Sequence, residues 1–217
     1  MIQPFAPHQH LAGYLLTKFD ANAADGSHDL SHIVRVWRNA VRIAGTEPKC
    51  DMEVLLAATI LHDCVPVEKS SPDRPIASRL AAAKAREIVV PLGWPPSRMD
   101  GLAHAIETHS FAAGLVPETL EAKILQDADK LDAIGALGVA RCFHVGGRMG
   151  GALYHPEDPG AEARPLDDRH FALDHFVAKL FKVADGFLTE EGKRMAAART
   201  RLMTEFVAAF RSEIEGN

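Results

Sequence analysis

The sequence predicts an all-α protein. Apolar residues recur every three or four positions through most of the 217 residues, which is the period of helices that bury one face. No segment alternates apolar and polar residues as a half-buried strand does. A chain of this length is ample for a hydrophobic core, and a hydrophobic fraction of 47% is that of an ordinary globular protein. We therefore expect a single domain over residues 1–217, with a core at about 25–140 and C-terminal helices at about 169–215 packed on it.

Three helices are expected in the first third of the chain. The first runs from Phe5 to about Ala24 and stops at Asp25-Gly26. The second starts near Ser27 and ends at Glu47-Pro48, and its apolar positions form one continuous stripe. Asp51 caps the third helix, which Pro66 stops.

The middle of the chain continues in the same way. Residues 67–76 are polar and proline-rich, which is typical of an exposed loop. Helices are expected over 77–90, over 97–108, and from Pro117 to about Val139 or beyond.

The last third begins with a long irregular connection. Residues 144–164 are rich in glycine and proline, and their length suggests a flap or an oligomer contact. Helices are then expected over 171–187 and 190–214. The expected buried face of the last helix consists of Met195, Ala198, Leu202, Phe206, Ala209 and Phe210.

Charge and cysteine content narrow the class of partner. A net charge of −5 gives no general attraction for nucleic acid or anionic membrane. The three cysteines are far apart, so they indicate neither a disulfide framework nor a thiolate zinc site. No leader or membrane-spanning run is evident. We expect a cytoplasmic protein with a small-molecule partner, no membrane association and no stable nucleic-acid complex, while a homodimer is left open.

The candidate chemistry is centred on the dipeptide His62-Asp63, which follows an apolar helix. A neutral imidazole beside a carboxylate suits a divalent metal. Upstream, His28 and His32 are four residues apart and share one helical face, so one can bind metal and the other substrate. Downstream, Asp129 and Asp132 are one turn apart within an apolar helix.

Together, His32, His62, Asp63 and Asp129 offer two imidazoles and two carboxylates from separate helices. About two positions of a six-coordinate ion would stay open for water or a substrate oxygen. This pattern suits Mn, Fe, Ni, Co or Mg better than a closed structural zinc site. His104 and His109 are five residues apart, and each is a candidate for a further ligand, a phosphate contact or a surface residue.

The order His, His-Asp, Asp in a helical chain resembles the HD superfamily of metal-dependent phosphohydrolases. Residues 25–36, 57–63 and 121–141 are similar to the small bacterial YpgQ/YedJ-like subfamily, and the similarity extends through His175 to the last helix. The resemblance implies that His32, His62, Asp63 and Asp129 bind the metal. It also implies hydrolysis of a phosphate ester or anhydride, with nucleotides as substrates, including triphosphates cut to monophosphate and pyrophosphate.

Further residues can be placed around that centre. Arg35, Lys130 and His109 are expected to contact the substrate, although a surface salt bridge is the alternative for Arg35 and Lys130. His28 is expected to position the attacking water or protonate the leaving oxygen, with Asp63 also catalytic. Asp132 is expected to orient a ligand.

One position departs from a pattern of the superfamily. HD nucleotidases specific for monophosphates resemble one another in a glutamate three residues after His-Asp, where this chain has Pro66. A monophosphatase mechanism is therefore not expected.

Two other functions remain open at this stage. An HD-type di-iron oxygenase would need extra histidine ligands, which His104 or His109 could supply. A non-catalytic nucleotide-binding or signalling module would be expected to lack one or more ligands, whereas all four are present here.

Overall fold

The computed structural model describes residues 2–18, 30–67, 71, 74–110 and 114–217, and the fold is all-α within them, as predicted. Among the described residues, the one β-type pairing is an isolated parallel bridge between Ala152 and Phe171. The chain divides into two compact units, Met1–Asp129 and Lys130–Asn217. Within the part of the chain that the structure describes, no helix combines the length and the hydrophobicity that a membrane span requires.

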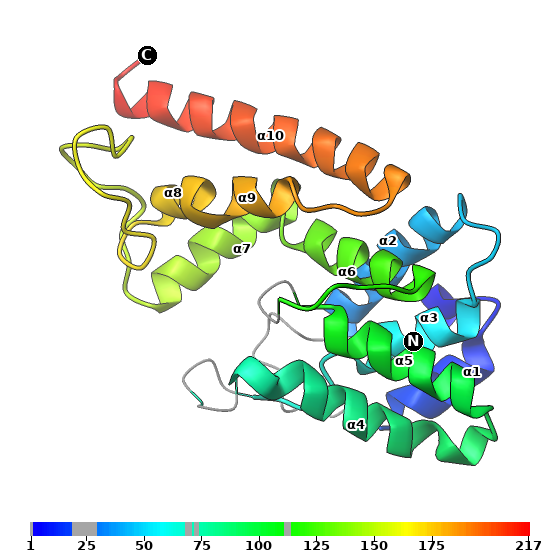
Figure 1. Ribbon diagram of the computed structural model, residues 1–217. Coiled ribbons are helices and arrows are strands. Elements are labelled where there is room, and N and C mark those ends of the chain that lie inside the picture. The colour runs from blue at the N-terminus through cyan, green and yellow to red at the C-terminus, as the bar shows by residue number, and fades with distance from the viewer. Residues whose placement is uncertain (1, 19–29, 68–70, 72–73, 111–113) are drawn as a thin grey trace. The chain divides into compact units, whose positions relative to one another are not determined.

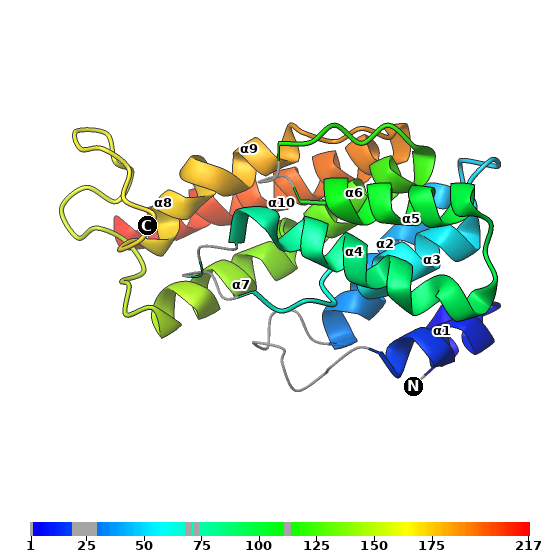
Figure 2. The ribbon, with the colours of Figure 1, turned by 60° about the horizontal axis from the view of Figure 1, so that its bottom comes forward.

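The first unit is arranged around α3. Its residues from Val54 to Leu61 are all buried, since α1, α2 and α5 all pack on α3, and α4 lies along α5 (Figures 1 and 2). The short helices are η1 (Gln3–Phe5), η3 (Arg74–Ile76) and η4 (Val90–Leu92). The longer helices are α1 (Gln9–Leu16), α2 (Leu30–Ala44), α3 (Met52–Leu61), α4 (Ala77–Val89), α5 (Pro96–Thr108) and α6 (Leu120–Asp132).

The start of α3 is held by the cap that the sequence predicts. Asp51 Oδ1 accepts hydrogen bonds from the backbone N–H groups of Glu53 and Val54, which the first turn of a helix leaves without a partner. The Arg98 guanidinium donates to both carboxylate oxygens of Asp51 at 2.8 Å, so α5 is tied to the cap of α3. The prediction of Asp51 as the cap is confirmed.

The second unit is built on α7 (Gly135–Arg148), α8 (Ala172–His175), a π-helical turn (Phe176–Leu180), α9 (Phe181–Ala184) and α10 (Glu190–Ile214). Helix α10 packs on α7 and α9 (Figure 1). Phe143, Phe176, Phe206 and Phe210 form a cluster, with neighbouring ring centroids 5.6–6.1 Å apart. Such aromatic pairs add to the stability that burial provides.

The helix predicted from Pro117 to Val139 or beyond is wrong in its extent. It ends at Asp132, and α7 starts at Gly135 after the extended residue Ile134. Gly135 has φ of +75°, a conformation that disfavours other residues, and the Arg199 side chain lies 2.9 Å from where a Cβ would be. A glycine in a left-handed conformation therefore separates the two helices.

Two further expectations need correction. The irregular connection starts at Met149 instead of residue 144, because α7 continues through Gly146 and Gly147. On α10, Met195 is buried as predicted, but Leu202 is 41% exposed and its neighbour Met203 is buried instead. Ala198 and Ala209 are also exposed, while Phe206 and Phe210 are half-buried. The inner face of α10 contains Arg199 and Met203 instead of Ala198 and Leu202. Each is one residue later in the chain than predicted, which corresponds to a rotation of about 100° around the helix.

Candidate metal centre

Helix ends of the first unit bring together the side chains of the candidate centre. His32 lies in the first turn of α2, His62 directly follows α3 with Asp63 next to it, and His109 follows α5. Asp129 lies in the last turn of α6. The ligand set that the sequence predicts is therefore close in space, and His109 joins it.

The distances between donor atoms are short. His32 Nε2 lies 3.3 Å from His62 Nε2 and 3.5 Å from Asp129 Oδ1, and His62 Nε2 lies 3.3 Å from Asp63 Oδ2. His32 and His62 are almost fully buried, whereas the side chains of Asp129 and Asp63 are 30% and 33% exposed. The imidazoles of the centre are thus shielded from solvent, whereas its carboxylates are accessible to solvent.

Backbone carbonyls set the tautomers of two imidazoles. His62 Nδ1 lies 2.8 Å from the Thr59 carbonyl oxygen, and His109 Nδ1 lies 2.6 Å from the Ile106 carbonyl oxygen. A carbonyl oxygen only accepts, so Nδ1 carries the hydrogen in both rings. When either ring is neutral, its Nε2 therefore presents a lone pair, as a metal ligand must.

This geometry fits a divalent cation. Bonds of 2.0–2.2 Å to neighbouring positions of a six-coordinate ion place the donor atoms about 3 Å apart. His32, His62 and Asp129 form one group whose donor atoms all lie within 4.8 Å of one another, and His62, Asp63 and His109 form a second. No other such group of three occurs among the described residues.

The carboxylates give the centre a negative potential. Burial alone would lower the pKa of His62, but Asp63 and Asp129 outweigh burial and raise it to about 9. Burial and the neighbouring His62 lower the pKa of His109 below its ordinary value. The two carboxylates therefore stabilise a positive charge at His62 Nε2. Either a proton on that nitrogen or a metal cation bound to it can supply the charge.

The predicted substrate contacts lie in different surroundings. Arg35 is half-buried one turn after His32, and its Nη1 donates to Ser31 Oγ at 2.8 Å. Lys130 is buried, and its Nζ donates to the Gly186 carbonyl oxygen at 2.6 Å. Asp132 is buried and accepts from Arg141 Nη1 at 3.0 Å. The proposed roles of these residues stay predictions, and His28 lies outside the described residues.

His104 and His109 differ in what they contact. His104 Nε2 accepts a hydrogen bond of 2.9 Å from the Glu118 backbone N–H, and His104 belongs to neither donor group. His109 Nε2 lies 3.8 Å from Asp63 Oδ1. The structure thus brings one of the two histidines to the centre.

Two buried amides beside the donor residues were not anticipated. Gln126 donates to the Thr108 carbonyl oxygen at 2.8 Å, next to His109. Asn39 donates to the Ala128 carbonyl oxygen at 3.1 Å, next to Asp129. The signal in the sequence is an amide within an apolar helical stripe, because a buried amide needs partners.

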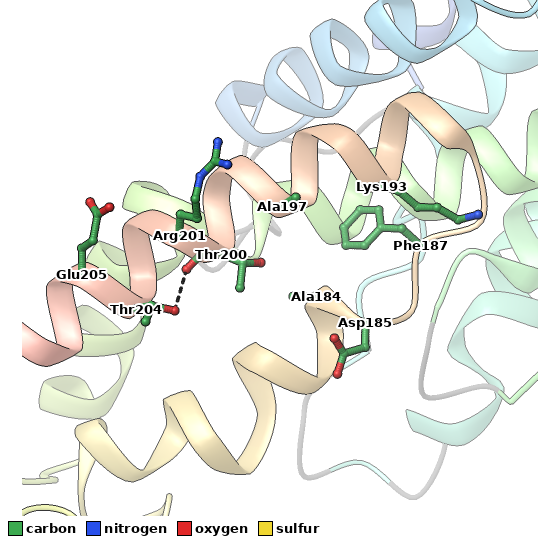
Figure 3. A pocket seen from close by; sticks show the side chains of 9 residues that line it. All are labelled: Ala184, Asp185, Phe187, Lys193, Ala197, Thr200, Arg201, Thr204 and Glu205. Carbon is green, nitrogen blue, oxygen red and sulfur yellow. Dashed lines mark hydrogen bonds between the residues drawn. The ribbon is translucent and has the colours of Figure 1, made fainter.

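A groove in the second unit has a different chemistry. Its volume is about 520 Å³, and Figure 3 shows it between the end of α9 and α10, with Phe187 and the threonines on its wall. Thr200 and Thr204 already donate to backbone carbonyls of α10, and Lys193 pairs with Glu190. No histidine lines it, so the groove does not resemble the metal centre.

Comparisons with known proteins agree with this geometry. The family model for the HD domain matches residues 29–134, a range that contains all five donor residues. YpgQ of Bacillus subtilis is 31% identical over 193 residues, which cover 87% of this chain and 85% of YpgQ.

Solved structures are similar to this chain over nearly its whole length. The structure of Bacillus subtilis YpgQ in complex with ADP has a TM-score of 0.71 at 28% identity and covers 94% of this chain and 95% of that one. An HD-superfamily hydrolase from Bacillus thuringiensis has a TM-score of 0.75 at 26% identity and covers 97% and 99%. The chain therefore belongs to the HD-domain superfamily, and its structural relatives include HD-superfamily hydrolases.

Proposed function

We propose that this protein is a metal-dependent phosphohydrolase that cuts a phosphoanhydride of a nucleotide, releasing monophosphate and pyrophosphate from a nucleoside triphosphate. The observation that carries the proposal is the group of His32, His62 and Asp129, whose donor atoms lie within 4.8 Å of one another beside Asp63. Its imidazoles are buried and its carboxylates are partly exposed, so a ligand can approach from the carboxylate side.

The relatives support the class of substrate. The Bacillus thuringiensis structure is described as an HD-superfamily hydrolase, and a structure of YpgQ contains ADP. ADP carries both the base and the phosphoanhydride that the proposed substrate requires. The proline at position 66, in place of the glutamate of monophosphate-specific relatives, is consistent with an anhydride as the bond that is cut.

The residues would act as follows. His32, His62, Asp63 and Asp129 would hold the divalent cation, which when bound supplies positive charge to a phosphoryl oxygen and lowers the pKa of a water. Thr59 keeps the His62 ring in the tautomer that this role needs. Arg35 would place a permanent positive charge one turn from His32, and His28 would orient the attacking water.

The test is a panel of nucleoside mono-, di- and triphosphates, each assayed with Mn, Mg, Co and Ni. Phosphate and pyrophosphate are measured separately, and the nucleotide products are resolved by chromatography. We expect triphosphates to give monophosphate and pyrophosphate in equal amounts, and chelation of the metal to stop the release.

The matched variants are Asp129→Asn and His104→Gln. Asp129→Asn removes a charged donor with little change in volume, so we expect kcat/KM to fall by at least about 100-fold, or about 2.7 kcal/mol of activation free energy. His104→Gln should retain parental activity because Gln can still accept from the Glu118 N–H. The absence of turnover with every nucleotide and metal, or full activity in Asp129→Asn, would refute the proposal.

A further inference from the structure

We infer that Asn39 and Gln126 are positioning residues: their buried side-chain amides fix α6 against α2 and against the end of α5, so that the metal donors keep their spacing before a cation binds. The inference rests on the metal site of the proposed function and deepens it, because it identifies the contacts that determine the geometry of that site.

Both amides lie on helix faces that also carry a donor. Asn39 lies on α2 seven residues after His32, which is about two turns, so the two residues share one face of the helix. Gln126 lies on α6 three residues before Asp129, and residues at that spacing are neighbours on a helix surface.

Each amide donates a hydrogen bond to a carbonyl of a different helix. Asn39 Nδ2 on α2 lies 3.1 Å from the Ala128 carbonyl oxygen on α6. Gln126 Nε2 on α6 lies 2.8 Å from the carbonyl oxygen of Thr108, the last residue of α5, where carbonyls lack a partner within the helix. Asn39 and Gln126 are 8% and 5% exposed, so solvent weakens these bonds little.

The carbonyls that accept these bonds are next to donor residues. The Ala128 carbonyl belongs to the peptide bond that leads to Asp129. In the same way, the Thr108 carbonyl belongs to the peptide bond that leads to His109. Because a peptide unit is planar and rigid, a hydrogen bond to its oxygen restricts the position of the Cα atom that follows. Each amide therefore restrains the backbone of one donor residue.

Two contacts fix the angle between α2 and α6. His32 Nε2 lies 3.5 Å from Asp129 Oδ1 at the first, and Asn39 donates to the Ala128 carbonyl at the second. Along α2, the residues of these two contacts are about 10.5 Å apart. One contact alone would let the helices rotate about it, and the second prevents that rotation. The spacing of His32 and Asp129 thus depends on Asn39.

This restraint affects metal binding because a metal site requires accurate geometry. Its donors must lie within about 0.5 Å of their productive positions. Without the amide bond, the adjacent donor has to be ordered when the cation binds, and this ordering reduces the affinity. The loss of either amide should therefore weaken metal binding in addition to lowering stability.

The test uses Asn39→Leu and Gln126→Met, which keep most of the side-chain volume and remove the N–H donor. The control is Val54→Ala in the first turn of α3, a core truncation that lowers stability and leaves both amides in place. Co affinity is measured by calorimetry, and coordination by the visible spectrum of bound Co. Urea unfolding with a chelator measures stability, and circular dichroism checks that each variant is folded.

We expect both amide variants to bind Co at least about tenfold more weakly than the parent and to alter the Co spectrum, since residues that orient metal ligands contribute about 10–100-fold to affinity. Val54→Ala should lose stability and keep the parental affinity and spectrum. Amides with a merely structural role would lower stability alone. Parental Co affinity and spectrum in folded Asn39→Leu or folded Gln126→Met would therefore overturn the inference.

A measurement on the parent chain does not depend on the folding of any variant. In isotope-labelled, metal-free protein, NMR follows hydrogen exchange of the side-chain amides, with the exposed Gln3 as the reference. We expect exchange at Asn39 and Gln126 to be at least about tenfold slower than at Gln3, because their bonds are buried and present before metal binds. Exchange as fast as that of Gln3 would contradict the inference.

The two proposals can fail separately. If both amide variants lose Co affinity but the parent hydrolyses no nucleotide, the proposed function fails and the role of the amides holds. If the parent hydrolyses triphosphates and the amide variants keep the Co affinity and spectrum, the function holds and the role of the amides fails.

Discussion

His62 has a different task at each ring nitrogen. Nδ1 is tied to the Thr59 carbonyl of its own helix, while Nε2 faces His32 and Asp63. The first contact is local and follows from the end of a helix, where carbonyls lack intrahelical partners. The second depends on other parts of the chain, so the same residue connects backbone geometry to the chemistry of the centre.

The protonation of His62 leads to a pH-dependent stability in metal-free protein. Its pKa is about 9 in the folded chain, above the ordinary 6.5, so the folded state binds the proton more tightly. This contribution is complete below about pH 6.5 and is lost as pH rises through about 9. Urea unfolding in the presence of a chelator should therefore show stability falling between pH 6.5 and 9.5.

The control for this experiment is His62→Asn, which removes the group that titrates. Its stability should vary less over the same pH interval than that of the parent. If the stability of the two proteins depended equally on pH, the pKa of His62 would not rise on folding, and the prediction would be wrong. Because a bound cation would replace that proton, added metal should also flatten the parental profile.

At the level of elements, the break between α6 and α7 shows how one residue changes a helical pattern. Apolar periodicity continues from Ile124 through Leu131 to Val139, which is why a single helix was expected. The backbone leaves the helical path at Ile134 and adopts a left-handed conformation at Gly135. Periodicity records which face is buried, and it does not record a change in helix direction.

We expect Gly135→Ala to destabilise the protein. A residue with a Cβ loses roughly 1–2 kcal/mol of stability in this left-handed conformation. The Arg199 side chain would also have to move, because it lies 2.9 Å from the position of the new Cβ. Gly147→Ala is the matched control, since it lies in α7 with nothing within 4 Å, and should be neutral or stabilising by up to about 1 kcal/mol. Urea unfolding of both variants measures the difference, and equal stabilities would contradict this account of the break.

At the scale of the whole molecule, the five donors come from α2, α6 and the segments that directly follow α3 and α5, all within the unit Met1–Asp129. A cation there would tie together elements that are distant in sequence. The second unit, Lys130–Asn217, has its own phenylalanine cluster. The expectation of a single domain stays a prediction.

Metal binding should therefore stabilise the folded chain. At a free Co concentration of 100 times Kd, the free energy of unfolding should rise by about 2.7 kcal/mol, because the complete site exists in the folded state. Hydrogen exchange should slow in α2, α3, α5 and α6. In Asp129→Asn the gain at the same Co concentration should be smaller, and an equal gain would place the cation elsewhere.

Helical period, capping and motif spacing are local properties, so the residues alone predict the helical class, the Asp51 cap and the order His, His-Asp, Asp. Two features are visible in the folded chain alone: His109 and not His104 reaches the centre, and Lys130 is buried against the Gly186 carbonyl. Those outcomes depend on how helices cross and where each one ends. Such packing is set by contacts between residues far apart in the chain, which no local pattern records.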